Sequence, residues 1–156
     1  MLFRSPSSPH AEAILRTAAK LGVKHYRLGW WHYKEGQPTK PQLDDIKPQL
    51  RDLAAMNKQF GLCGILQNHA GKELVGAKVW DYIEIVQGEN PKQIGVAFDI
   101  GHALNELRTE WRAAFKKLGK HFRIAYIKDW SPSAGYSELG KGEIEQSGYK
   151  IGRAHV

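Results

Sequence analysis

The chain has 156 residues, of which 42% are hydrophobic and 25% are charged, a composition typical of a single globular domain. No apolar run approaches the roughly 20 residues that span a bilayer, so no membrane partner is expected, and the first residues lack the features of a signal peptide. We therefore expect a cytoplasmic protein. Export stays open, because we expect the true N-terminus to lie upstream of Met1.

The formal net charge is +7, which raises the question of a nucleic-acid partner. The basic residues are spread along the predicted helices, with a modest cluster only between positions 108 and 123. Cations near the end of a helix stabilise its dipole, which explains that cluster without a phosphate ligand. We predict no nucleic-acid partner, and the sequence gives no indication of the oligomeric state.

Amphipathic helices and short apolar strands alternate along the chain. We expect helices at residues 9–21, 41–60, 79–87 and 106–118, and strands at 23–30, 62–66, 94–98 and 122–127. Pro48 lies inside the second helix, where it predicts a kink or a break. Short strands that are apolar on both faces and separated by helices indicate a parallel sheet covered by helices.

Polar residues follow each predicted strand. Ligands of parallel α/β folds bind outside the carboxyl ends of the strands, so this repetition predicts a site at one edge of the sheet. The sequence has no glycine-rich phosphate loop, which argues against a nucleotide-binding fold. The candidate residues, in chain order, are Arg27, Gln67, Asn68, His69, Asp99, His102, Lys128 and Asp129.

Asp99 and His102 are the candidate metal ligands. A carboxylate at the end of a strand and an imidazole three residues later can face one divalent cation. The alternative is an aspartate that caps the next turn beside a hydrogen-bonded histidine.

Gln67, Asn68 and His69, together with Arg27, are the candidate substrate-binding residues. Their amide, imidazole and guanidinium groups suit hydrogen bonding to sugar hydroxyls. The alternative for the first three is turn formation before Gly71.

Lys128 and Asp129 are the candidate catalytic residues. They form either a charge pair at the mouth of the site or a pair that polarises and orients a substrate oxygen.

Several of these segments resemble the sugar phosphate isomerase/epimerase superfamily, the xylose isomerase-like TIM barrels that also include endonuclease IV. The resemblance runs from about residue 15 to 144 and includes GVKHYRLGW, LQNHAG, VAFDIGHA, YIKDW and LGKGEI. It implies an α/β fold, an incomplete (β/α)8 TIM barrel with about four to five parallel strands and covering helices. Typical members bind a divalent cation (Mn, Mg, Co or Zn) and shift hydrogens between adjacent carbons of a sugar.

The resemblance also implies a ligand set, which this sequence matches in part. Asp99 matches the aspartate ligand and His102 the histidine that follows it. The first glutamate ligand falls on Gln67, and the histidine before Lys-Asp falls on Tyr126. We expect the final glutamate to lie beyond this chain, so the cation would be held weakly.

The chain is expected to be part of a longer protein, because a complete barrel needs about 250 residues and eight strands. We assign residues 1–149 to a partial xylose isomerase-like barrel. The last six residues, Ile151–Val156, equal the translation of a common sequencing adapter. We therefore interpret 150–156 as adapter read-through and exclude it from the fold.

These features predict a fragment of a sugar or sugar phosphate isomerase or epimerase that uses a divalent metal ion and a small-molecule carbohydrate. We expect the intact protein to be an enzyme and the fragment to be inactive. The alternative is a non-catalytic carbohydrate-binding barrel that has lost its metal. An endonuclease IV-like nuclease is disfavoured, because residues 133–138 lack the Asp-x-His pair of that branch.

Overall fold

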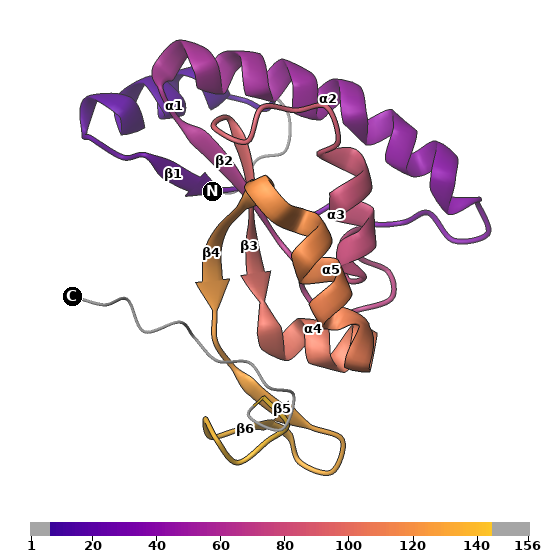
Figure 1. Ribbon diagram of the computed structural model, residues 1–156. Helices are drawn as coiled ribbons and strands as arrows, with labels where there is room; N and C mark the ends of the chain where they lie inside the picture. The colour runs from indigo at the N-terminus through magenta and orange to yellow at the C-terminus, as the bar shows by residue number, and fades with distance from the viewer. Residues whose placement is uncertain (1–6, 145–156) are drawn as a thin grey trace.

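Four parallel strands form the central sheet of the computed structural model, which describes residues 7–144. The predicted tail at 150–156 lies outside the described residues. The strands follow one another in space in the order of the sequence, and each pairs in parallel with the next (Figure 1). Their bounds are β1 His25–Arg27, β2 Cys63–Gln67, β3 Ile94–Asp99 and β4 Phe122–Tyr126. A doubly wound sheet would reverse this order, so the arrangement is that of a partial (β/α) barrel, as predicted.

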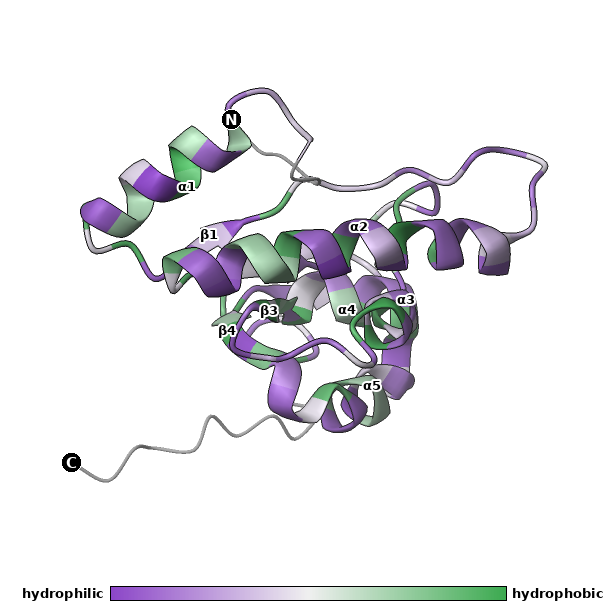
Figure 2. Ribbon diagram, turned by 90° about the horizontal axis from the view of Figure 1, so that it is seen from above, coloured by the Kyte–Doolittle hydropathy of each residue, from purple (hydrophilic) through white to green (hydrophobic). Residues whose placement is uncertain are grey.

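One helix precedes β1, and the others connect successive strands and cover the sheet. They are α1 Ala11–Lys20, α2 Thr39–Phe60, α3 Val79–Ile85, α4 Ile100–Leu107 and α5 Trp111–Leu118. Green and purple residues alternate along α2 in Figure 2, as expected for a helix with one buried side. Among residues 7–144, no helix is both long enough and apolar enough to cross a membrane.

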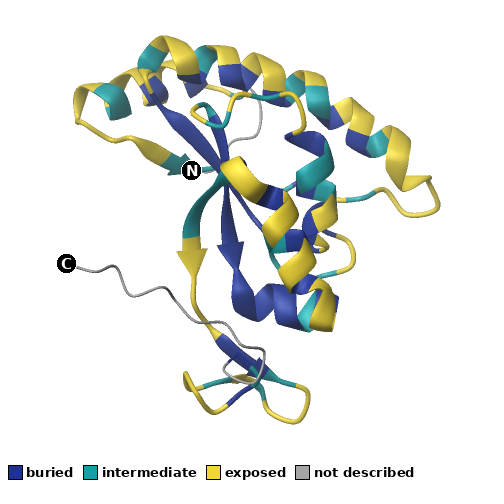
Figure 3. Cartoon of the chain, viewed as in Figure 1, coloured by how far each residue is buried: buried dark blue, intermediate teal, exposed yellow. Residues whose placement is uncertain are grey.

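The two faces of the sheet have different surroundings. The main hydrophobic core lies between the sheet and the helices and includes the fully buried Leu50, Tyr82 and Phe98. The opposite face, which we call the inner face, carries a small separate cluster, against which Ile124 packs. Its members are Cys63, Ile65 and Ala97, from alternate positions of the strands. Figure 3 shows that β2 and β3 are buried, whereas much of β4 is partly or fully exposed.

Two expectations about the helices are corrected. Of the kink or break expected at Pro48, the break is wrong, because α2 runs without interruption from Thr39 to Phe60. Pro48 is exposed, and Ile46 and Leu50 on either side of it are buried in the core. The single helix expected at 106–118 is two helices, with a short 3-10 turn at Arg108–Glu110 between them. Arg108 has a φ of 51°, which ends α4 and redirects the chain.

A small antiparallel hairpin after β4 was not predicted. Its strands are β5 Asp129–Ser131 and β6 Gly135–Ser137, and Asp129 pairs with Ser137. Strands of three residues are too short to produce a recognisable alternation of apolar and polar residues.

Candidate functional site

The polar residues at the carboxyl ends of β2 and β3 lie together around Asp99. Asp99 ends β3 and is the N-cap of α4, where its Oδ1 accepts a hydrogen bond from the backbone N–H of His102 at 3.3 Å. Its Oδ2 lies 2.8 Å from Nζ of Lys128 and 3.3 Å from Nε2 of Gln67. The side chain of Asp99 is fully buried, whereas that of Lys128 is 46% exposed. Predicted metal, substrate and catalytic residues therefore meet at one carboxylate.

Asn68 supports Asp99 through the main chain. Its Oδ1 accepts a hydrogen bond from the N–H of Asp99 at 2.7 Å, and its Nδ2 donates to the carbonyl of Asp99 at 2.9 Å. The Asn68 side chain is fully buried. These two bonds fix the end of β3 relative to the end of β2, so Asn68 positions the carboxylate of Asp99.

Aromatic rings surround the other side of the site. The rings of His69 and His102 lie 4.2 Å apart between centroids, and Trp30 meets His69 edge-on at 5.3 Å. The hydroxyl of Tyr136, in the hairpin, forms a hydrogen bond with Nδ1 of His102. Tyr136 was not among the predicted site residues, because it is brought to His102 only by the path of the hairpin.

Burial determines the charge of His102. Desolvation is the main cause that lowers its pKa from the ordinary value to about 4, and the attraction of Asp99 opposes this only in part. The imidazole is therefore neutral near pH 7, which is the form that binds a metal ion.

Two buried atoms beside Asp99 have no hydrogen-bond partner among the described residues. They are Oε1 of Gln67 and Nε2 of His102, and the latter lies 3.6 Å from Oδ2 of Asp99. Buried polar atoms without partners are uncommon, and these two are an oxygen and a nitrogen of types that ligate divalent cations. With Asp99 they fit a weak cation site of one carboxylate, one imidazole and one amide. Within residues 7–144, no three His, Cys, Asp or Glu side chains form a metal-binding group.

Asp129 lies in a different environment from Asp99. Its carboxylate accepts four backbone hydrogen bonds, from Trp130, Gly140, Gly142 and Ile144, at 2.8 to 3.0 Å. Burial alone would raise the pKa of Asp129, but these four bonds outweigh it and hold the pKa below the ordinary value. Four bonds fill the lone pairs of a carboxylate, so this side chain holds the 129–144 segment together.

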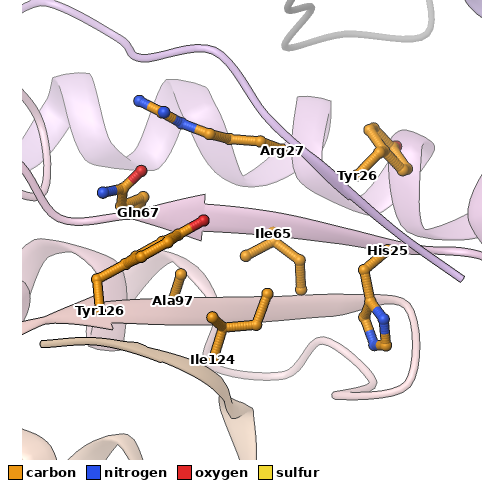
Figure 4. Close-up of a pocket in the computed structure, with 8 residues that line it drawn as sticks. All are labelled: His25, Tyr26, Arg27, Ile65, Gln67, Ala97, Ile124 and Tyr126. Carbon is orange, nitrogen blue, oxygen red and sulfur yellow. The ribbon is translucent and has the colours of Figure 1, made fainter.

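The inner face of the sheet carries a cavity of about 150 Å³. Figure 4 shows Arg27, Gln67 and Tyr126 toward one end of it and His25 toward the other. Arg27 stacks on Trp30, with its guanidinium carbon 4.2 Å from the ring centroid. Tyr126 is 39% exposed, and β4, Phe122–Tyr126, contains no His, Cys, Asp or Glu.

A family model of the xylose isomerase-like TIM barrel matches residues 8–151. The chain belongs to this family. No curated protein matches the sequence. The family model covers both the parallel sheet and the hairpin, so the motifs quoted from the sequence lie within one recognised domain.

Solved structures of similar fold include several sugar epimerases. A D-tagatose 3-epimerase-like protein superposes with a TM-score of 0.63 at 19% identity, covering 89% of this chain and 57% of its own. D-psicose 3-epimerase from Clostridium cellulolyticum H10 gives 0.61 at 15% identity, covering 95% and 57%. The IolI protein with a bound zinc atom gives 0.68 at 17% identity, covering 93% and 57%. The chain therefore spans somewhat more than half the length of these structures.

Proposed function

We propose that this chain belongs to a carbohydrate isomerase or epimerase that binds a divalent metal ion at Asp99. The observation that carries the proposal is the pair of unpartnered buried atoms, Gln67 Oε1 and His102 Nε2, beside a buried carboxylate. The family and the fold shared with sugar epimerases support the choice of a small-molecule carbohydrate as substrate. The zinc atom in the IolI structure supports a divalent cation, with Mn, Mg, Co and Zn as candidates.

Each side chain has a proposed part in this chemistry. Asp99 and His102 would hold the cation with the amide oxygen of Gln67, and Tyr136 would fix the orientation of the His102 ring through Nδ1. A bound divalent cation would polarise the oxygen atoms of a hydroxy-ketone and so acidify the neighbouring C–H bond. His69 would contact the substrate from the aromatic side of the site.

Lys128 is the proposed catalytic residue in direct contact with the site. Its ammonium group lies 2.8 Å from Asp99 and is half-exposed, so it can donate a hydrogen bond to a substrate oxygen. Asp129 follows it in the chain, and its four backbone bonds fix the segment from which Lys128 projects. We therefore propose that Asp129 positions Lys128.

A second candidate function is carbohydrate binding without a metal ion or catalysis. The ion pair between Lys128 and Asp99 favours it, because the carboxylate already has a positive partner. In addition, only one carboxylate belongs to the candidate ligand set, and negative charge governs the affinity of a site for hard cations.

Metal binding and hydrogen exchange separate the two candidates. Calorimetry with Zn²⁺ should give binding that is lost in an Asp99→Asn variant and retained in Asp52→Asn, an exposed position on α2. In the intact protein, proton NMR in D₂O, with D-tagatose or D-psicose and Mg²⁺, should show loss of the signal from the hydrogen on a carbon next to the carbonyl. Sugar binding without either effect would support the binding protein and contradict the isomerase proposal.

A further inference from the structure

Arg27 is a cation at the carboxyl end of the sheet that the proposed metal chemistry does not use. It is the last residue of β1, and its register partner is Ile65 of β2. Both residues line the cavity on the inner face, together with Gln67. The alternation of side chains along a strand therefore directs Arg27 toward the same space as the candidate ligands.

The guanidinium group of Arg27 is held by stacking but has no anion within ion-pair distance in the part of the chain that the structure describes. It stacks on Trp30, whose own Nε1 donates a hydrogen bond to the carbonyl of Gln67 at 3.2 Å. Its Nε is buried without a hydrogen-bond partner among residues 7–144, where it also has no carboxylate within ion-pair distance. The Arg27 side chain as a whole is only half-buried, so its terminal nitrogens are available to a ligand, and a ligand anion would match a charge that no described residue matches.

The neighbouring charges leave this end of the cavity positive. Lys128 is already paired with Asp99, so the charge of that carboxylate is balanced. A neutral sugar would leave the charge of Arg27 unmatched, whereas an anionic group would match it.

We propose that Arg27 binds the acidic group of the substrate, so that the carbohydrate is a sugar acid or a sugar phosphate. The planar fork of a guanidinium forms two parallel hydrogen bonds to a carboxylate or a phosphate, and both groups present the oxygen pair that it needs. Trp30 holds the fork in orientation by stacking on it, which lowers the entropy lost on binding. This inference rests on the proposed function, because it names the substrate class of the same site.

Calorimetry with three sugars of the same ring tests the proposal: D-glucose, D-glucuronate and D-glucose 6-phosphate. At least one acidic sugar should bind about tenfold or more tightly than D-glucose. The affinities of D-glucuronate and D-glucose 6-phosphate then show whether the site prefers a carboxylate or a phosphate. Arg27→Gln should remove this preference, and Arg27→Lys should retain part of it. Arg51→Gln, which removes an exposed cation from α2, should leave the preference unchanged.

The melting temperature of Arg27→Gln supplies an independent measurement. Because Arg27 has no ion-pair partner in the described residues, its removal should lower the melting temperature by no more than the loss of its stacking on Trp30 costs, about 4 °C. A larger decrease, together with equal binding of all three sugars, would show that Arg27 has a structural partner and would overturn the proposal. Binding of none of the sugars, or a preference that survives in Arg27→Gln, would also overturn it.

The result can be separated from the test of the isomerase proposal. An anion preference that depends on Arg27, without any hydrogen exchange in D₂O, would contradict the isomerase and leave this inference standing. Hydrogen exchange on a neutral sugar, without an anion preference, would support the isomerase and overturn this inference.

Discussion

Asp99, which ends β3 of the parallel sheet, and Asp129, which begins β5 of the hairpin, are both fully buried, yet they have opposite surroundings. Asp129 accepts four backbone N–H bonds, which fill its lone pairs, and it forms no ion pair with any residue between 7 and 144. Asp99 accepts one backbone bond and turns its second oxygen toward Lys128, Gln67 and His102.

The difference shows how a structural aspartate and a site aspartate can be told apart. A carboxylate that is saturated by backbone donors has no capacity left for a ligand, whereas one that faces side chains can exchange them for a ligand. We therefore expect substitutions of Asp129 to affect stability first, and substitutions around Asp99 to affect binding first. The following predictions test this contrast.

The largest effect is expected for Asp129→Asn. The amide cannot accept four bonds, so buried backbone donors at residues 130–144 lose their partner, at a cost of about 2–4 kcal/mol of unfolding free energy. Urea denaturation followed by tryptophan fluorescence measures it, with Asp52→Asn as the control for loss of an exposed carboxylate. Equal stability of the two variants would contradict the structural role of Asp129.

Acid should remove the same contribution from the unsubstituted chain. The pKa of Asp129 is lower in the folded state than its ordinary value, so the unfolded state binds more protons and the stabilisation is present above about pH 4. It is lost as the pH falls through the lower, folded-state pKa. The stability difference between the unsubstituted chain and Asp129→Asn should therefore shrink below about pH 4 in unfolding experiments, and a constant difference would count against this linkage.

A smaller effect is expected for Lys128→Gln, which should raise the affinity for Zn²⁺ by about tenfold, or about 1.4 kcal/mol. The ammonium lies 2.8 Å from Asp99, so a cation at that carboxylate must displace it and is repelled by it. Lys116→Gln, an exposed position on α5, is the matched control and should bind as the unsubstituted chain does. Weaker binding in Lys128→Gln would show that Lys128 supports the metal site rather than competing with it.

The smallest effect on stability is expected for Asp99→Asn, within about 1 kcal/mol of the unsubstituted chain. Asparagine is a good N-cap and can still accept the bond from the N–H of His102, while the half-exposed Lys128 returns to solvent. Thermal and urea unfolding check this value. A loss as large as that of Asp129→Asn would remove the distinction between the two aspartates.

The sequence was sufficient for the parallel sheet and for most of its helices. Strands such as Ile94–Asp99 are apolar at nearly every position, because the side chains on both faces of the strand are buried. That local pattern can be read from the sequence. The boundaries of α4 and α5 were not predicted correctly. They depend on the N-cap hydrogen bond that Asp99 accepts from His102 and on the positive φ of Arg108, and the spacing of hydrophobic residues indicates neither.

For the candidate site, the sequence determined which polar residues end the strands, and parallel pairing brings Gln67, Asp99 and Lys128 to one edge. Only the tertiary structure decided what each polar atom contacts. Asn68 binds the main chain of Asp99, Asp129 binds four amides of a later segment, and Tyr136 reaches His102 from 34 residues away. Hydrogen bonds depend on distance and direction between atoms remote in the chain, and residue type and spacing do not fix either quantity.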